Sequence, residues 1–571
     1  MDSGRFLLAV VLMIAVMVVT NMLFAPDRPV PGATGADTLL VDTAGAAPVG
    51  ADADSAPPRA RDTAAVPAAT PPDTAAAADP DRQPIPGEEI AGDTIFLATP
   101  LIRLGFAANG ALVSARLEEY EGFGEDAAEN DRVELAPRNG RGLVRPRLRV
   151  GDRDVDLPLS PVPGDTTDGA TAVFEGSDGR RSARLTYRVP DDGYLLRVTL
   201  EAAGFEQTPQ LLLDLPSTLR VNEANPGEDE RSLAYVVNSP RQGIESVRLR
   251  SVREPRTDNG PFTWVAVKNK YFLVAAIAAG EGTLPFGGVR ANPLEERDAA
   301  ELVASLPPAT DGTFAFDLYI GPQEADRLSA VGYELEDVNP YGWSLFRPIL
   351  RPLGHAITWA VVGLHNTLNI AYGWVLILFG VLVRIVLWPL NARSMRSQLK
   401  NMELQPRIKE IQEKYRNSPE MMQKEMMKLY KEGFNPLGGC LPLLIPFPVL
   451  IALFFVFQST IYFRGVDFLW LPDLSRHDPL YILPVALGAS MFLQQWIMAK
   501  STPPHMDNPQ MKMMMYFMPV FMTVIFLRFA SGLNLYYVAQ NIASLPQQYQ
   551  LMRERRAWQA GKRKIEGAAA R

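Results

Sequence analysis

Residues 370–390 read IAYGWVLILFGVLVRIVLWPL, and this stretch decides the class of fold. About 20 consecutive apolar residues are enough for a helix to cross the hydrocarbon core of a bilayer, so the stretch predicts a membrane-spanning helix. Its single charged residue is Arg384. A charged side chain at the centre of such a helix costs about 2.5 to 3.5 kcal/mol on insertion scales, so an intramembrane arginine predicts a functional site.

Other apolar segments lie on both sides of this one. We expect four further spans in the second half and an uncleaved anchor at the N-terminus: Leu441–Ile461, Tyr481–Ala499, Met513–Leu527 with a start near Pro509, Leu533–Leu551, and residues 1–25. Only residues 528–532 separate the last two spans, which predicts a helical hairpin. Residues 341 to about 353 are apolar but contain arginines and are broken by Pro348 and Pro352, which predicts an interfacial helix within residues 331–369.

The distribution of lysine sets the expected orientation. Of the twelve lysines, only Lys268 and Lys270 precede residue 340. The others fall in residues 391–435, 500–512 and 552–571, and an even number of expected spans separates these three segments. Basic loops stay in the cytoplasm, so the pattern predicts six spans with both termini and the basic tail, residues 552–571, in the cytoplasm.

The polar first half contains two regions. Residues 26–92 are dominated by Ala, Pro, Asp, Thr and Gly, a composition that predicts a disordered linker. In residues 93–330, short β-rich runs recur between turn residues, which predicts one β-sandwich domain outside the cytoplasm. The clearest of these runs are Leu143–Val150, Ala183–Val189, Tyr194–Leu200, Gln210–Leu215, Trp264–Ile277 and Thr313–Ile320.

Arg384 shares one face of its expected helix with two glycines. Gly373 and Gly380 lie 11 and 4 residues before it, and residues 4, 7 or 11 apart return to nearly the same side of a helix. Glycines there would widen a cavity or permit close helix contact. Polar residues mark two other spans: Asn534, Tyr537 and Asn541 in the last, and Gln494 and Gln495 in the span Tyr481–Ala499.

Two interpretations of these polar residues stay open. Together with Arg384 they would line a wet groove that enters the membrane from the cytoplasm. Alternatively, Arg384 extends towards lipid headgroups and the other polar side chains pair between helices.

The expected cytoplasmic loop, residues 391–435, has the pattern of a helical hairpin. Ser418 and Pro419 are suited to begin its second helix as N-cap and first residue. Its basic side chains form either a solvated face or a surface for lipid headgroups or the ribosome: Arg407, Lys409, Lys414, Lys424 and Lys428.

The sequence lacks the residues that several classes of function require. Neither the apolar run of the anchor, residues 6–24, nor any other expected span contains Asp or Glu, so a carboxylate proton relay has no candidate. The sequence has no phosphate-binding Gly-rich loop of the Walker type, and its four scattered histidines and single cysteine, Cys440, predict no metal site. We therefore expect a protein that is not an enzyme, with no cofactor and no nucleic-acid substrate.

Specific motifs resemble those of one family. Asn435 to Ile445 read NPLGGCLPLLI, residues 341–343 read YGW, residues 517–519 read FMP, and residues 531–533 read SGL with Tyr536 and Tyr537 following. These motifs closely resemble those of the YidC membrane protein insertases. The opening residues 1–3, MDS, the long extracytoplasmic domain and residues 319–322, YIGP, resemble the Gram-negative type of that family. The resemblance covers the whole chain except the linker.

The resemblance implies an inner-membrane protein with a five-helix insertase core at residues 370–551, a groove open to the cytoplasm, and a periplasmic β-supersandwich similar to galactose mutarotase. It further implies that nascent membrane proteins are the substrates, inserted and folded alone or with the Sec translocon among membrane lipids. Arg384 falls at the family's groove arginine, whereas Gly380 stands where the family often has Thr.

Two other functions are considered beside that of an insertase. A polytopic transporter or channel would also need several spans. Mutarotase-like sugar chemistry would need a histidine acid, but the first histidine, His355, lies beyond the β-rich region.

Overall fold

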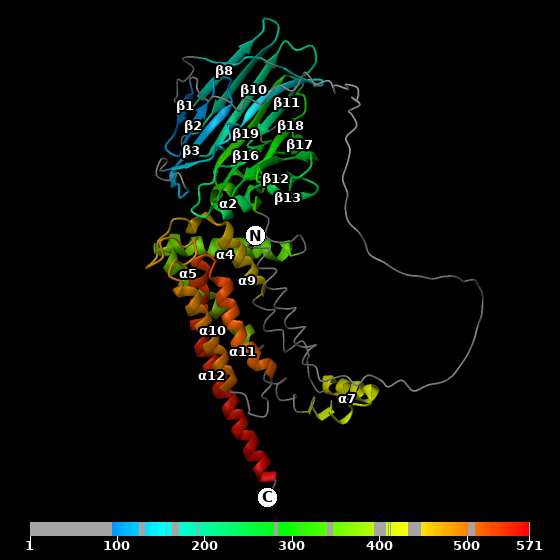
Figure 1. The fold of residues 1–571 in the computed structure, drawn as a ribbon, viewed down its shortest axis with the longest axis vertical. Coiled ribbons are helices and arrows are strands. Elements are labelled where there is room, and N and C mark those ends of the chain that lie inside the picture. Colours follow the sequence, from blue (N-terminus) through cyan, green and yellow to red (C-terminus); the bar gives the residue numbers. More distant parts are fainter. Residues whose placement is uncertain are drawn as a thin grey trace, which may run out of the picture.

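The computed structural model describes residues 94–124, 132–155, 157–162, 171–190, 193–278, 284–309, 311–339, 346–392, 407–408, 410–411, 413–431, 447–500 and 509–569 (Figure 1). The expected anchor, residues 1–25, and linker, residues 26–92, lie outside the described residues, as do the motif at residues 435–445 and Lys409. The chain forms a β domain followed by a helical core (Figure 1).

Three antiparallel sheets build the β domain. In spatial order, the nine-stranded sheet contains β13 (Gly243–Arg248), β12 (Ala234–Ser239), β15 (Trp264–Lys268), β16 (Phe272–Ile277), β19 (Thr313–Pro322), β10 (Leu195–Ala203), β9 (Ser182–Arg188), β8 (Thr171–Ser177) and β7 (Ser160–Pro161). The six-stranded sheet contains β14 (Arg256–Phe262), β17 (Phe286–Pro293), β18 (Ala300–Leu306), β11 (Gln210–Leu215), β5 (Arg145–Val150) and β6 (Arg153–Val155). The four-stranded sheet contains β1 (Ile95–Ala98), β2 (Ile102–Phe106), β3 (Leu112–Glu121) and β4 (Arg132–Glu134).

The burial of the strands follows their sequence patterns. Every second residue of β9 is buried, because one face packs on the core and the other meets solvent. All residues of β12 and β16 are buried, so both of their faces are covered. One hydrophobic cluster fills the domain, and Trp264, Tyr187 and Tyr235 are among its largest fully buried side chains.

The expected run Trp264–Ile277 is two strands rather than one. A turn at residues 269–271 separates β15 from β16, which pair as antiparallel neighbours. The side chain of Asn269 accepts hydrogen bonds from the backbone N–H groups of Tyr271 at 3.1 Å and Phe272 at 2.8 Å. An asparagine that bonds its own following backbone in this way favours a turn.

Short helices connect or follow the strands: α2 (Pro226–Ser232), α3 (Ala325–Val331), η1 (Leu249–Ser251) and η2 (Leu335–Asp337). The second half contains α4 (Arg347–Leu368), α5 (Tyr372–Val386), α7 (Pro419–Lys431), α9 (Phe447–Ser459), η4 (Ile461–Phe463), α10 (Ile482–Lys500), α11 (Pro509–Phe526) and α12 (Ser531–Ala569). The helix α12 packs against α5 and α10, α10 packs against α11, and α4 packs against α9 and α5.

Several expected helix limits agree with the structure. Helix α11 begins at Pro509, and α7 begins at Pro419 directly after Ser418. The helices α11 and α12 touch near their short connection, where the side chain of Asn534 donates to the carbonyl of Phe526 at 3.1 Å. Beyond that point each packs along α10, so α10 and not a direct contact along the length of α11 and α12 holds these two helices together.

The prediction for the helix near residue 350 was wrong in length. Helix α4 continues to Leu368, well past Leu353. Pro348 lies in the first turn, where its missing N–H is not needed, and Pro352 removes only one further intrahelical bond. The helix ends where Asn369 adopts a left-handed conformation, with φ of 50°. At the other end of the chain, α12 continues past Leu551 to Ala569.

Among the helices of the described residues, none combines the length and the apolar character needed to cross a bilayer.

Candidate functional site

Arg384 lies in the last turn of α5 and is half-buried. Its Nε atom is buried and has no hydrogen-bond partner within the described part of the chain. The next two side chains on the helix are apolar and exposed, Ile385 at 57% and Val386 at 72%. The guanidinium thus has an unused buried donor, and exposed apolar side chains lie on the adjoining faces of the same helical turn. Such a turn offers both a polar and an apolar contact to a ligand.

The two glycines on the same face of α5 lie at close contacts. A Cβ atom on Gly380 would lie 3.0 Å from the carbonyl oxygen of Tyr536 and 3.4 Å from the Cβ atom of Ala539, both on α12. A Cβ atom on Gly373 would overlap the ring of Phe468 at 2.1 Å. Both glycines are buried. Close helix contact, one of the two roles considered, matches the geometry of Gly380, whereas Gly373 lies against a loop side chain.

A ladder of polar side chains joins α10 to α12. Asn541 donates from its side chain to the hydroxyl of Ser490 at 2.9 Å, and Gln494 donates to the carbonyl of Asn541 at 3.2 Å. Further along α12, Ser544 donates to the same carbonyl at 2.7 Å. These contacts match the interpretation in which polar residues pair between helices. Gln495, the other candidate on α10, is half-buried.

Asn534 and Tyr537 lie near the start of α12. Asn534 is fully buried, and its Oδ1 atom has no partner among the described residues although its Nδ2 atom is bonded. The hydroxyl of Tyr537 is also buried without a partner there, while its ring packs against Phe526 at 5.5 Å. Buried polar atoms are nearly always paired, so these atoms mark unused capacity for water or a polar ligand.

The sequence interpretation missed Gln547 and Gln548. Both are buried on α12, and Gln547 donates to the carbonyl of Trp388 at 3.0 Å, one helical turn beyond Arg384. The Oε1 atom of each glutamine lacks a partner within the described ranges. The two glutamines follow Ser544 by three and four residues, so they continue the face of α12 that carries Asn534, Tyr537 and Asn541. This helical spacing could have identified them from the sequence.

The basic side chains proposed for the cytoplasmic hairpin are exposed where they are described. Arg407, Lys414, Lys424 and Lys428 all reach solvent. Lys428 pairs with Glu425 at 2.6 Å, and the ammonium of Lys414 lies 5.4 Å from the ring centre of Tyr415. Exposed pairs of this kind add little stability, so an anionic partner can compete with them for these side chains.

Two protein families match adjacent parts of the chain. The family described as YidC periplasmic domain matches residues 95–354, and the family described as 60Kd inner membrane protein matches residues 363–557. The boundary between the two matches falls within α4.

Curated relatives named membrane protein insertase YidC are similar over long segments. The protein of Oleidesulfovibrio alaskensis is 33% identical over 516 residues, which cover 86% of this chain and 91% of the relative. The protein of Chlorobaculum parvum is 33% identical over 396 residues, which cover 65% of this chain. The chain spans 66% of that protein's length and 65% of the Chlorobium limicola relative's length, just under two thirds of each.

Solved structures are more distant. The crystal structure titled active YidC insertase with the first transmembrane domain resolved matches with a TM-score of 0.33 and 19% identity, over 80% of this chain and 93% of that chain. The YidC of Thermotoga maritima matches with a TM-score of 0.28 and 16% identity, over 80% of this chain and 97% of that chain.

Proposed function

This chain belongs to the YidC family of membrane protein insertases, and from that premise we propose that it inserts and folds integral proteins of the inner membrane. The observation that carries the proposal is Arg384, a half-buried guanidinium on an otherwise apolar helix, whose Nε atom has no hydrogen-bond partner among the described residues. A transporter or channel, the alternative considered from sequence, is not favoured by the relatives. Like the family in general, the protein acts without enzymatic chemistry, and it needs no cofactor.

The proposed mechanism separates the two parts of a nascent segment. The polar flank enters a groove from the cytoplasm. There, Arg384 and the polar atoms of α12 that lack a partner in the described ranges lower the flank's desolvation cost. The apolar part moves into lipid along the exposed apolar surface. Burial from water supplies about 25 cal/mol per Å² of apolar area, so insertion needs no nucleotide. A membrane potential would assist acidic flanks by about 2.3 kcal/mol per charge per 100 mV.

The proposed topology has six spans, with both termini in the cytoplasm and the β domain in the periplasm. The spans are an anchor within residues 1–25 and five segments that correspond to α5, α9, α10, α11 and α12. Gln494, Gln495, Asn534, Tyr537 and Asn541 border the groove in this proposal. Gly380 lets α5 approach α12, and Gly373 leaves room for the ring of Phe468. The lysine distribution supports this orientation.

The proposed partners are nascent membrane proteins, the Sec translocon and membrane lipids, together with the ribosome. The exposed basic side chains of the cytoplasmic hairpin support contacts with anionic partners.

Site-specific crosslinking tests the central claim. A photo-reactive residue replaces Arg384 in the full chain, and ribosomes carrying a stalled membrane protein are supplied to the membranes. The matched control carries the same residue at Val386, two positions along α5 and 72% exposed. We expect nascent-chain adducts from position 384 to exceed those from position 386. Lipid adducts alone at position 384 would show that the arginine only extends towards headgroups.

A further inference from the structure

The loop between α9 and α10, residues 460–481, extends into the β domain. We call it the outer loop. Its Arg464 side chain is only 3% exposed, and Nε lies 2.7 Å from the Glu223 carboxylate. The guanidinium also lies over the rings of Phe123 at 4.6 Å and Phe272 at 5.4 Å. A charge pair removed from water in this way holds its two segments together, because leaving either charge alone is costly.

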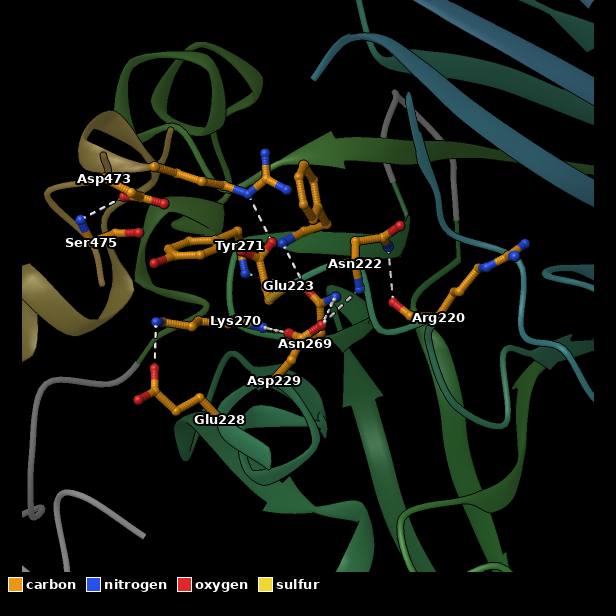
Figure 2. Close-up of polar contacts among 12 residues, drawn as sticks. Arg220, Asn222, Glu223, Glu228, Asp229, Asn269, Lys270, Tyr271, Asp473 and Ser475 are labelled. Carbon is orange, nitrogen blue, oxygen red and sulfur yellow. Dashed lines mark hydrogen bonds and ion pairs between the residues drawn. The ribbon is translucent and has the colours of Figure 1, made fainter. Parts of the chain in front are cut away.

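Glu223 lies beside a network of polar contacts in the β domain (Figure 2). Its neighbour Asn222 donates from its side chain to the carbonyls of Glu134 and Arg220, both at 2.9 Å. Asp229 of α2 is 1% exposed and accepts hydrogen bonds from the backbone of Lys270 at 3.0 Å and from the side chain of Asn269 at 3.2 Å. The partner of Arg464 therefore rests on a buried network that joins α2 to the β15–β16 turn.

The other side of the outer loop holds the beginning of α12. The N–H of Gly532 donates to the carbonyl of Leu474 at 2.9 Å, and the N–H of Ser531 donates to the carbonyl of Arg476 at 2.6 Å. The hydroxyl of Ser531 donates to the carbonyl of Asp473 at 3.1 Å. The first N–H groups of a helix lack acceptors within the helix, and here carbonyl groups of the outer loop are the acceptors. Figure 2 shows Asp473 and Ser475 of this loop beside Tyr271 and Lys270 of the β domain.

We propose that Arg464 is a positioning residue through which the β domain fixes the outer end of α12. The connection runs from Glu223 through Arg464 and the outer loop to Ser531 and Gly532. Because α12 packs against α5, it sets where Arg384 lies. This inference rests on the proposed insertase function, since it assigns the β domain a part in holding the groove.

Hydrogen–deuterium exchange on the purified full chain tests the connection. The variant Arg464→Met/Glu223→Gln removes both charges, so no unpaired charge stays buried, and Arg464→Lys is the milder variant should the first fail to fold. Arg184→Met is the matched control, because Arg184 and Glu175 form an exposed pair at 2.9 Å on the far strands β8 and β9. We expect exchange at Ser531 and Gly532 to become about tenfold faster in the double variant, less so in Arg464→Lys, and not in the control.

A client-insertion assay on the same variants completes the test. We expect the double variant to insert about threefold less client, while exchange within β9, β10 and β19 stays unchanged. Unchanged exchange at Ser531 and Gly532, or faster exchange with undiminished insertion, would overturn the proposal. Failure of the unaltered chain to insert any client would instead refute the proposed function, and the exchange result would still decide whether the connection exists.

Discussion

The approach of α5 to α12 at Gly380 makes a quantitative prediction about side-chain size. Replacing Gly380 with Ala places a methyl group 3.0 Å from the Tyr536 carbonyl and 3.4 Å from the Gln540 nitrogen, both backbone atoms of α12. Backbone atoms cannot move aside as a side-chain tip can, so the helices must separate by a few tenths of an ångström. Such overpacking costs about 1 to 3 kcal/mol. Against this, Ala gains about 0.5 to 1 kcal/mol over Gly within a helix.

Gly363 of α4 provides a control that separates the cost of overpacking from the gain in helix propensity. It lies inside a helix, and a Cβ atom there would meet nothing within 4 Å. Gly363→Ala should therefore show the helical gain alone, and Gly380→Ala should be about 2 kcal/mol less stable than it. For a helical region of this size, that difference corresponds to roughly 6 °C in melting temperature. Gly380→Thr, which installs the residue common in the family, should lose more, because it adds two heavier branches against the same backbone.

Thermal unfolding of the purified variants in one detergent measures these differences. If Gly380→Ala melted at or above the temperature of Gly363→Ala, α12 could not approach α5 as described. A stable Gly380→Thr would refute the reasoning more directly, since its hydroxyl and methyl groups would have to fit where the structure has no space.

Three other predictions concern charge and burial. Arg384→Ala should impair insertion of clients with acidic flanks more than clients with neutral flanks, and equal impairment in a reconstituted assay would remove the electrostatic part of the mechanism. Burial, and then the Glu223 carboxylate, raise the pKa of Asp229 to about 7. Unfolded aspartate titrates near 3.9, so the folded chain holds an extra proton between about pH 4 and 7, and its free energy of unfolding falls as pH rises through that window. An asparagine at this position cannot lose a proton, so the free energy of unfolding of Asp229→Asn should rise relative to that of the unaltered chain by up to about 2 kcal/mol between pH 5 and pH 8, measured by denaturant melts. Tyr187→Phe should cost the β domain about 1 to 2 kcal/mol, because it leaves the buried Gly110 carbonyl without its 2.9 Å donor, whereas Tyr333→Phe, at an exposed side chain, should melt unchanged.

The sequence predicted the limits of helices and strands well where those limits depend on neighbouring residues. The start of α7 at Pro419 follows from the N-cap preference of Ser418, and β11 spans Gln210–Leu215 as its leucine-rich run indicates. The length of α4 was underestimated because prolines in the first turns of a helix read as breaks. Hydrophobic packing along the rest of the helix outweighs the one bond that Pro352 removes.

Contacts between residues far apart in the sequence could not be predicted from local patterns. Arg464 and Glu223 lie 241 positions apart, and nothing near either residue indicates the other. Helical spacing placed Gly380 on the face of Arg384 but could not say whether space or a neighbouring backbone lay opposite. That distinction depends on α12, which the chain reaches about 150 residues later.

Helix α12 has a mechanical consequence because of its length. Its 39 residues extend about 58 Å at a rise of 1.5 Å per residue, nearly twice the thickness of a bilayer's hydrocarbon core. The outer loop holds one end, so the helix can act as a lever with its pivot at Ser531 and a single flexible point at Pro546. A tilt of about 10° at the held end would move the far end by about 10 Å. Force applied to the basic tail would therefore reach the β domain through α12 and the outer loop, reduced by any bending at Pro546.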